Sequence, residues 1–152
     1  MINEWINTFD DFWLERRNIA KILLSPSDET RTQWYWKANR RENKINIEQC
    51  DDPFTGRQLT AKDGVRLLGE TLELYKENQW NYKPKVEKTK NGEEIFHQSA
   101  VFETFIVDPR SKAERIYVKF AVVKNAVCYN PTIGETYNGT RVQLWSFHPP
   151  EK

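Results

Sequence analysis

The sequence predicts an α+β fold in which N-terminal helices pack on a C-terminal antiparallel β-sheet. Before Trp80, apolar residues recur mostly at the spacing of a helix. After Trp80 the spacing changes to two, and Gly- and Pro-containing turns separate runs rich in β-branched and aromatic residues. A chain of 152 residues with no internal repeat or linker fits one domain. We therefore expect a single domain over residues 1–152, mainly helical over 1–79 and mainly sheet over 80–152.

The first helix is expected over residues 3–24. An apolar stripe runs from Trp5 to Leu23 at mostly helical spacing, and the segment that contains Pro26 ends the helix. A break near Asp10 stays open as an alternative.

The pattern is weaker in the segment that follows. Residues 28–43 are polar and basic around Trp34-Tyr35-Trp36, which suits either a helix or a strand. Ile45 and Ile47 alternate with polar neighbours and predict a short strand. Residues 51–56 then contain the Pro and Gly of a tight turn.

The second helix is expected over residues 60–78. Apolar residues from Val65 to Tyr75 fall on one stripe, and Thr60 is a cap candidate with Asp63 three residues later. Glycines inside this stretch lower its helix propensity, so packing has to supply most of its stability.

The C-terminal half predicts an antiparallel sheet. Turns are expected at Lys90-Asn91-Gly92, at Pro109 and at Asn138-Gly139, just before the last strand. The strands that these turns separate are expected at residues 94–98, 100–107, 115–123, 126–129 and 141–148.

Composition excludes several classes of protein. Lys and Arg number 23 against 22 Asp and Glu, so no whole-molecule field attracts nucleic acid, and any such binding needs a local patch. The chain has no apolar run long enough for a membrane span and no basic, aliphatic leader, so we expect a soluble protein that acts in the cytoplasm without binding a membrane. Cys50 and Cys128 lie far apart without a CxxC motif, which favours two reduced thiols over a buried bridge and argues against zinc.

Strand alternation gives two faces to the segment from Arg115 to Val123. Ile116 and Phe120 belong to the core face, and Lys119 projects from the other face, either into solvent or towards an anion in a cleft. In the last strand, the same alternation places Gln143, Trp145 and Phe147 on one side and Val142, Leu144, Ser146 and His148 on the other.

His148 ends the last expected strand, at the natural rim of a cleft. An imidazole there can act as acid or base near neutral pH, and the alternative is a surface histidine bonded to backbone. His97 is the second histidine, and its Gln and Ser neighbours suggest an exposed edge.

The C-terminal pattern resembles a known group of proteins. Residues 115–120, RIYVKF, followed after a turn region by residues 142–148, VQLWSFH, look like the end of bacterial ribonuclease toxins in the group named for barnase, EndoU, colicins and RelE. Toxin domains of contact-dependent inhibition systems and colicin D-like nucleases share this order of helices before a small antiparallel sheet. The resemblance covers about residues 100–150.

The resemblance implies cleavage of RNA, with tRNA among the candidate substrates, and without a metal or other cofactor. Such cleavage needs a base for the ribose 2′-OH, an acid for the leaving oxygen and a cation for the transition state. We assign acid–base work to His148, charge stabilisation to Lys119 and the partner acid–base role to His97. Supporting phosphate contacts are expected from Ser146, Arg115, Tyr117 and Arg141. A cognate immunity or antitoxin protein is the expected partner, and delivery from another cell is expected if the chain belongs to a larger toxin.

A second candidate patch lies in the basic, aromatic segment before residue 45. Trp34 and Trp36 can stack on unpaired bases while Arg40 and Arg41 neutralise phosphates. The alternative is that the tryptophans belong to the core and that the charges form a solvated face.

Other functions stay open from the sequence. A magnesium-dependent nuclease could use Glu87, Glu103 and Asp108, because strands can assemble ligands that are distant in sequence. The many tryptophans and tyrosines also suit a non-catalytic protein-binding module, such as an inhibitor or immunity protein. A non-catalytic nucleic-acid binder is the third alternative.

Overall fold

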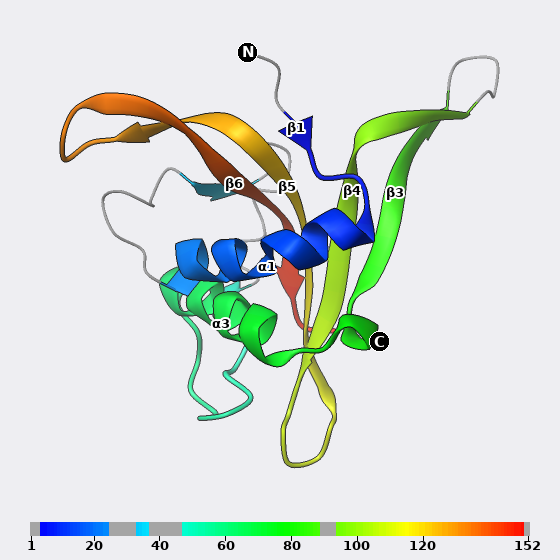
Figure 1. Ribbon diagram of the computed structural model, residues 1–152. Coiled ribbons are helices and arrows are strands. Elements are labelled where there is room, and N and C mark those ends of the chain that lie inside the picture. The colour runs from blue at the N-terminus through cyan, green and yellow to red at the C-terminus, as the bar shows by residue number, and fades with distance from the viewer. Residues whose placement is uncertain (1–3, 25–32, 37–46, 89–93, 151–152) are drawn as a thin grey trace.

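The computed structural model describes residues 4–24, 33–36, 47–88 and 94–150, with the backbone path alone for residues 36, 61, 84–88 and 94–99. A six-stranded mixed sheet has the order β2-β6-β5-β4-β3, with β1 paired to β5. Both long helices lie on one face of this sheet (Figure 1). The α+β class and the order of helices before most strands are therefore confirmed.

Helix α1 spans Phe9–Leu24 and begins later than the sequence predicts. Thr8 caps it, because the Asp11 N–H donates to Thr8 Oγ1 over 3.2 Å. The preceding residues Glu4–Trp5 form β1, which pairs with Lys124 and Val123 of β5. Pairing with a distant strand thus overrides the helical pattern at this end. The alternative of a break near Asp10 is wrong, since the helix runs through that residue.

Helix α3 spans Ala61–Leu74, and the Asp63 N–H donates to the capping Thr60 hydroxyl over 3.2 Å. It ends before the predicted residue 78, and a short 3₁₀ turn follows at Glu77–Gln79. A Cβ at Gly69 would lie 2.9 Å from Leu24 Cγ, so this glycine permits the close approach of α3 to α1.

Four long strands form consecutive antiparallel hairpins: β3 (Asn81–Lys88), β4 (Glu94–Val107), β5 (Glu114–Asn130) and β6 (Glu135–His148). Each of β4 and β5 joins two segments that the sequence predicts as separate strands. The hairpin turn expected at residues 90–92 lies outside the described residues, but Lys88 pairs with Glu94 on either side of it.

Two predicted features of the connections are wrong. Asn138 and Gly139 do not form a turn but pair with Val127 and Ala126 inside the β5–β6 hairpin. The chain turns earlier, where Gly134 adopts a φ of +70° that favours glycine. Ile47 is helical rather than in a strand, whereas Ile45 lies outside the described residues.

Trp34–Trp36 forms a strand, β2, and not a helix. It runs parallel to β6, with Tyr35 opposite Gln143, so the sheet is mixed and not purely antiparallel. The part of the chain before residue 80 therefore contributes two short strands as well as the helices.

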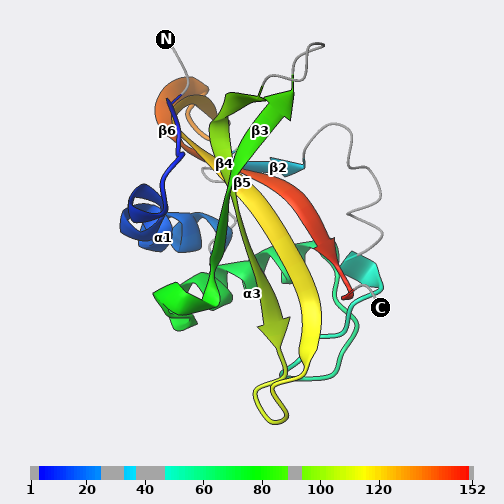
Figure 2. The same cartoon turned by 90° about the vertical axis from the view of Figure 1, so that its right-hand side faces the viewer.

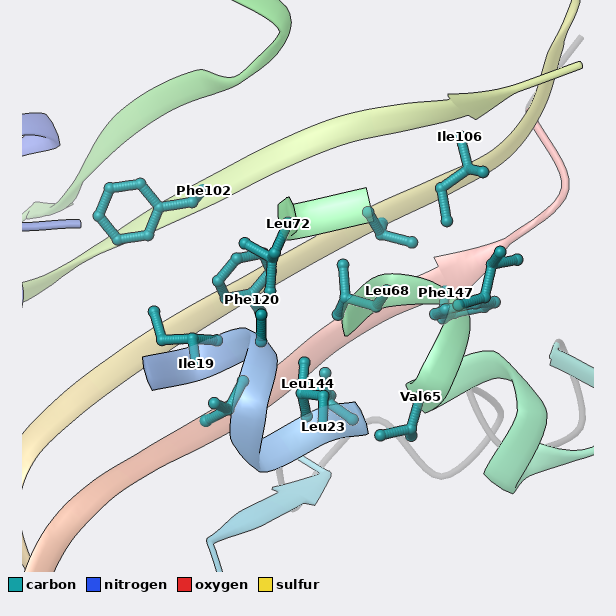
Figure 3. Close-up of a cluster of buried hydrophobic side chains, with 14 of the residues drawn as sticks. Ile19, Leu23, Val65, Leu68, Leu72, Phe102, Ile106, Phe120, Leu144 and Phe147 are labelled. Atoms are coloured by element: carbon teal, nitrogen blue, oxygen red, sulfur yellow. The ribbon is translucent and has the colours of Figure 1, made fainter. Parts of the chain in front are cut away.

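The main core fills the space between the helices and one face of the sheet, here called the covered face. Figure 3 shows α1 and α3 side chains meeting those of β4, β5 and β6. Phe12 stacks on Phe102 with ring centroids 4.3 Å apart, and both rings are fully buried together with Phe120. Close packing of large rings gives this face most of the hydrophobic stabilisation.

Both cysteines are buried and unbonded to each other, as the sequence predicts. Burial, together with the nearby Asp51 charge, raises the pKa of the Cys50 thiol to about 12, which keeps it protonated and unreactive. No helix in the described ranges combines the length and apolar character needed to cross a bilayer.

Candidate functional site

The candidate site lies on the opposite face of the sheet, here called the open face, which neither long helix covers (Figure 2). Strand β5 alternates as predicted: Ile116, Val118 and Phe120 face the core, and Tyr117 and Lys119 face the other way. The open face is therefore where the charged side chains of the central strands gather.

The alternation predicted for the last strand is wrong from Ser146 onward, since Ser146, Phe147 and His148 each lie on the face opposite to the predicted one. Lys119 pairs with Ser146 and Phe120 pairs with Leu144, so Trp145 is an extra residue in a β-bulge. After the bulge, the alternation of side chains between the two faces of the sheet is shifted by one residue. Val142, Leu144 and Phe147 all face the main core, whereas Gln143, Trp145, Ser146 and His148 belong to the open face.

The bulge brings the sequence-predicted residues together. Ser146 lies opposite Lys119, and His148 lies opposite Tyr117 on the same face of the sheet. Lys119 and His148 consequently share one surface, as the sequence argument requires. We call Glu103, Lys119 and Ser146 the polar row, and Phe105, Tyr117 and His148 the aromatic row, since each set crosses β4, β5 and β6.

Glu103 is the central group that the sequence argument did not assign to acid–base work. Only 6% of its surface is exposed, although it lies on the open face, because neighbouring side chains surround it. Lys83 Nζ from β3 lies 3.0 Å from Glu103 Oε1, and the Tyr117 hydroxyl donates to Glu103 Oε2. On its other side, Glu103 lies directly opposite Lys119 of the neighbouring strand β5.

The surroundings of Glu103 keep its carboxylate ionised. Burial alone raises the pKa of Glu103, but the hydrogen bonds from Tyr117 and Lys83 and the charges of Lys83 and Lys119 outweigh it. The resulting pKa lies below the ordinary glutamate value. Each carboxylate oxygen has a second lone pair, so the group can accept a further proton donor without losing these bonds.

His148 is half-buried at the end of β6, with its ring 5.2 Å from the ring of Tyr117. Its Nδ1 lies 2.7 Å from the carbonyl oxygen of Pro149. A carbonyl oxygen only accepts, so Nδ1 carries a hydrogen and Nε2 is the nitrogen left to exchange protons with a substrate.

Lys119 places its ammonium 5.6 Å from the centre of the Trp145 ring, a cation–π distance. Ser146, opposite it, is 7% exposed. The polar row therefore presents a carboxylate, an ammonium and a hydroxyl side by side on one surface.

Arg115 lies near this surface but is engaged elsewhere. Its Nη2 is 3.3 Å from Asp108 Oδ2, and Arg110 Nε is 3.4 Å from Asp108 Oδ1. The Arg110 backbone N–H and the two guanidinium groups outweigh burial and lower the pKa of Asp108 to about 2. This ion-pair cluster fixes the β4–β5 turn.

These contacts bear on the two-carboxylate magnesium alternative. Glu103 lies beside Lys83 and Lys119, and Asp108 lies beside two arginines, so cationic side chains already occupy the space near both groups. The Glu87 side chain lies outside the described residues. Within the described ranges, no three His, Cys, Asp or Glu side chains lie close enough to hold a metal ion.

His97 is not brought to this site. Its backbone lies in β4, eight residues before Phe105, which is about 26 Å along an extended strand. That part of β4 pairs with β3 in the outer hairpin, since the neighbouring Phe96 faces Val86. The His97 side chain lies outside the described residues.

The basic, aromatic patch is described only in part. Trp34 packs against the main core, which favours the structural alternative for this residue. The side chains of Trp36, Arg40 and Arg41 lie outside the described residues. Arg141 lies 4.4 Å from the centre of the Tyr35 ring, next to Gln143 on the open face.

Three surface hollows lie away from the open face. One of about 370 Å³ lies between α1 and the β5–β6 turn, one of about 530 Å³ between α1 and α3, and one of about 290 Å³ beside the N-terminal half of α3. None of the three is lined by the polar or aromatic row.

Comparisons with known proteins do not identify the chain: no family model, no curated protein and no solved structure matches it. The chemical case for this site therefore rests on its own geometry. A buried ionised carboxylate, an ammonium and an imidazole with one nitrogen available can accept a proton, stabilise an anion and donate a proton.

Proposed function

We propose that the protein is a metal-independent endoribonuclease whose active site is the open face. Glu103 is the general base, His148 is the general acid, and Lys119 stabilises negative charge. The observation that carries this proposal is the arrangement of Glu103 and His148 on either side of β5, with Lys119 and Tyr117 between them.

The chemistry balances with these groups alone. The Glu103 carboxylate takes the proton of the ribose 2′-OH while the 2′-oxygen bonds to phosphorus. The bond from phosphorus to the 5′-oxygen breaks, and His148, which enters the step as the imidazolium with a hydrogen on both ring nitrogens, gives the Nε2 proton to that oxygen. The products are a 2′,3′-cyclic phosphate and a 5′-hydroxyl end, and proton exchange with water restores both side chains.

The spacing suits in-line displacement, in which the entering and leaving oxygens lie on opposite sides of the phosphorus. Strands β4 and β6 flank β5 and are about 10 Å apart in a sheet, and the positions of Glu103 and His148 are also offset by about 7 Å along the strands, which makes their backbone separation roughly 12 Å. A phosphate over β5 would therefore have the carboxylate on one side and the imidazole on the other. The Lys119 ammonium, with Lys83 behind Glu103, would offset the charge of the transition state.

The sequence resemblance to bacterial ribonuclease toxins supports the same reaction class. The mechanism proposed here differs from the sequence-based assignment in one role, since Glu103 replaces His97 as the partner of His148. Cleavage of tRNA and recognition by a cognate immunity protein are parts of this proposal that follow from the resemblance alone.

The test is an RNA cleavage assay with purified protein, total RNA and tRNA, in EDTA and then in magnesium. We expect cleavage in both buffers, with 2′,3′-cyclic phosphate ends on the products. Intact RNA in both buffers would refute the proposal, and cleavage in magnesium alone would replace it with the two-carboxylate mechanism.

A second candidate is a non-catalytic protein-binding module. Val127, Tyr129 and Ile133 are exposed towards the outer end of the β5–β6 hairpin, away from the polar row. Exposed apolar side chains on a projecting ribbon are typical of protein contacts. Intact RNA together with loss of partner binding in Val127→Lys would favour this candidate.

A further inference from the structure

The aromatic row lies beside the proposed catalytic groups and has no role yet in the reaction. Phe105 and Tyr117 pair across β4 and β5 with ring centroids 5.3 Å apart, and His148 continues the row on β6. Both Phe105 and Tyr117 are half-buried, unlike the fully buried rings of the covered face.

Phe105 lies in a part of β4 that the outer strand β3 does not reach. Strand β3 begins at Asn81, opposite Glu103, and no pairing with β3 extends to Phe105. The hydroxyl of Tyr75 takes the place of that strand: it donates to the Phe105 carbonyl over 3.0 Å and accepts from the Val107 N–H over 3.1 Å. This pair of bonds holds the Phe105 backbone rigid at an otherwise free edge.

We infer that Phe105, supported by Tyr117, is a stacking platform for an unpaired nucleobase next to the cleaved phosphodiester. The inference rests on the proposed function and narrows its substrate to single-stranded RNA. Lys119 and Glu103 are two residues along their strands from Tyr117 and Phe105, or about 7 Å. A phosphate over the polar row therefore places a neighbouring base within reach of the aromatic row.

Stacking fits this surface better than base-edge recognition. Every base has a π-face, and an open row of rings beside cationic groups is the combination that binds single strands without strict sequence preference. A base paired in a duplex presents only its edges, so a double-stranded substrate cannot use the platform.

The experiment uses a single-stranded oligodeoxynucleotide that carries one 2-aminopurine, whose fluorescence falls on stacking. Because the probe lacks 2′-hydroxyls, it cannot be cleaved by the proposed reaction. We expect wild-type protein to quench the fluorescence, and Phe105→Ala to weaken binding roughly ten- to a hundred-fold. Phe105→Leu keeps an apolar side chain without a ring and should also lose the quenching, whereas Phe105→Trp should retain it.

The matched control is Phe54→Ala, which removes a ring that is 50% exposed in the turn before α3. It should bind as the wild type does. Unchanged quenching in Phe105→Ala, or equal quenching of a duplex probe, would overturn the inference. Failure of this inference is distinguishable from failure of the proposed function. RNA cleavage without quenching would refute the stacking platform, and quenching without RNA cleavage would refute the nuclease.

Discussion

The two faces of the sheet come from the same strands, yet they carry different kinds of side chain. On the covered face, Phe102, Phe120 and Phe147 are almost fully buried against the helices. On the open face, the residues beside them in sequence are Glu103, Lys119 and Ser146. Alternation along a strand thus places most of the buried apolar surface on one face and the charged groups on the other, so the largest losses of stability should come from the covered face.

The largest expected effect is on the covered face. Phe120→Ala should lower the free energy of unfolding by about 3–5 kcal/mol, because it removes a fully buried ring from the centre of the core. Urea unfolding followed by circular dichroism measures this. Phe54→Ala, the exposed counterpart, should change stability by less than about 0.5 kcal/mol; equal losses in the two variants would break the comparison.

The next effect is on the open face. Glu103→Gln and His148→Ala should each lower RNA cleavage by a factor of about 10²–10⁴, since each removes one proton-transfer group. Both variants should still unfold cooperatively. Arg66→Ala, an exposed charge on the helical side, serves as the control. Full cleavage by either open-face variant would contradict its assigned role.

A smaller effect concerns the pH dependence of cleavage. The Tyr117 hydroxyl stabilises the Glu103 carboxylate, so Tyr117→Phe should raise the pKa of Glu103. The acid limb of kcat/KM should then move to higher pH, because the base must be ionised to act. An unchanged limb in this variant would show that Glu103 is not the titrating base.

The smallest effect is on stability in acid. The fold lowers the pKa of Glu103, so its contribution is present above the ordinary glutamate pKa of about 4.3 and is lost as the pH falls through the lower folded value. Unfolding midpoints from neutral pH to about pH 3 should therefore fall more steeply for the wild type than for Glu103→Gln. Parallel curves would mean that the carboxylate is not stabilised in this way.

The sequence predicted the features that depend on local pattern. The alternation that places Lys119 opposite the core, the Thr60 cap and the change of period at Trp80 all come from neighbouring residues. Features that depend on distant pairing were missed. The parallel pairing of Tyr35 with Gln143 and the early start of the sheet at Trp5 have no local signal.

The candidate site shows the same division. The bulge at Trp145 changes the phase of β6, and only its register against β5 reveals it. Glu103 stands out as a candidate only through its ion pair with Lys83 and its hydrogen bond from Tyr117, which belong to two other strands. One local signal was available: Glu103 is a charge between Phe102 and Thr104 in the middle of a strand, the same anomaly that singled out Lys119.

The most direct test of the central claim is to map nucleotide binding onto the two faces. Backbone amide resonances of labelled protein would be followed by NMR as the single-stranded oligodeoxynucleotide is added. We expect shifts concentrated at Glu103, Tyr117, Lys119, Ser146 and His148, with little change in the outward residues of α1 and α3. Shifts concentrated on the helices, or none at saturating probe, would contradict the assignment of the open face as the active site.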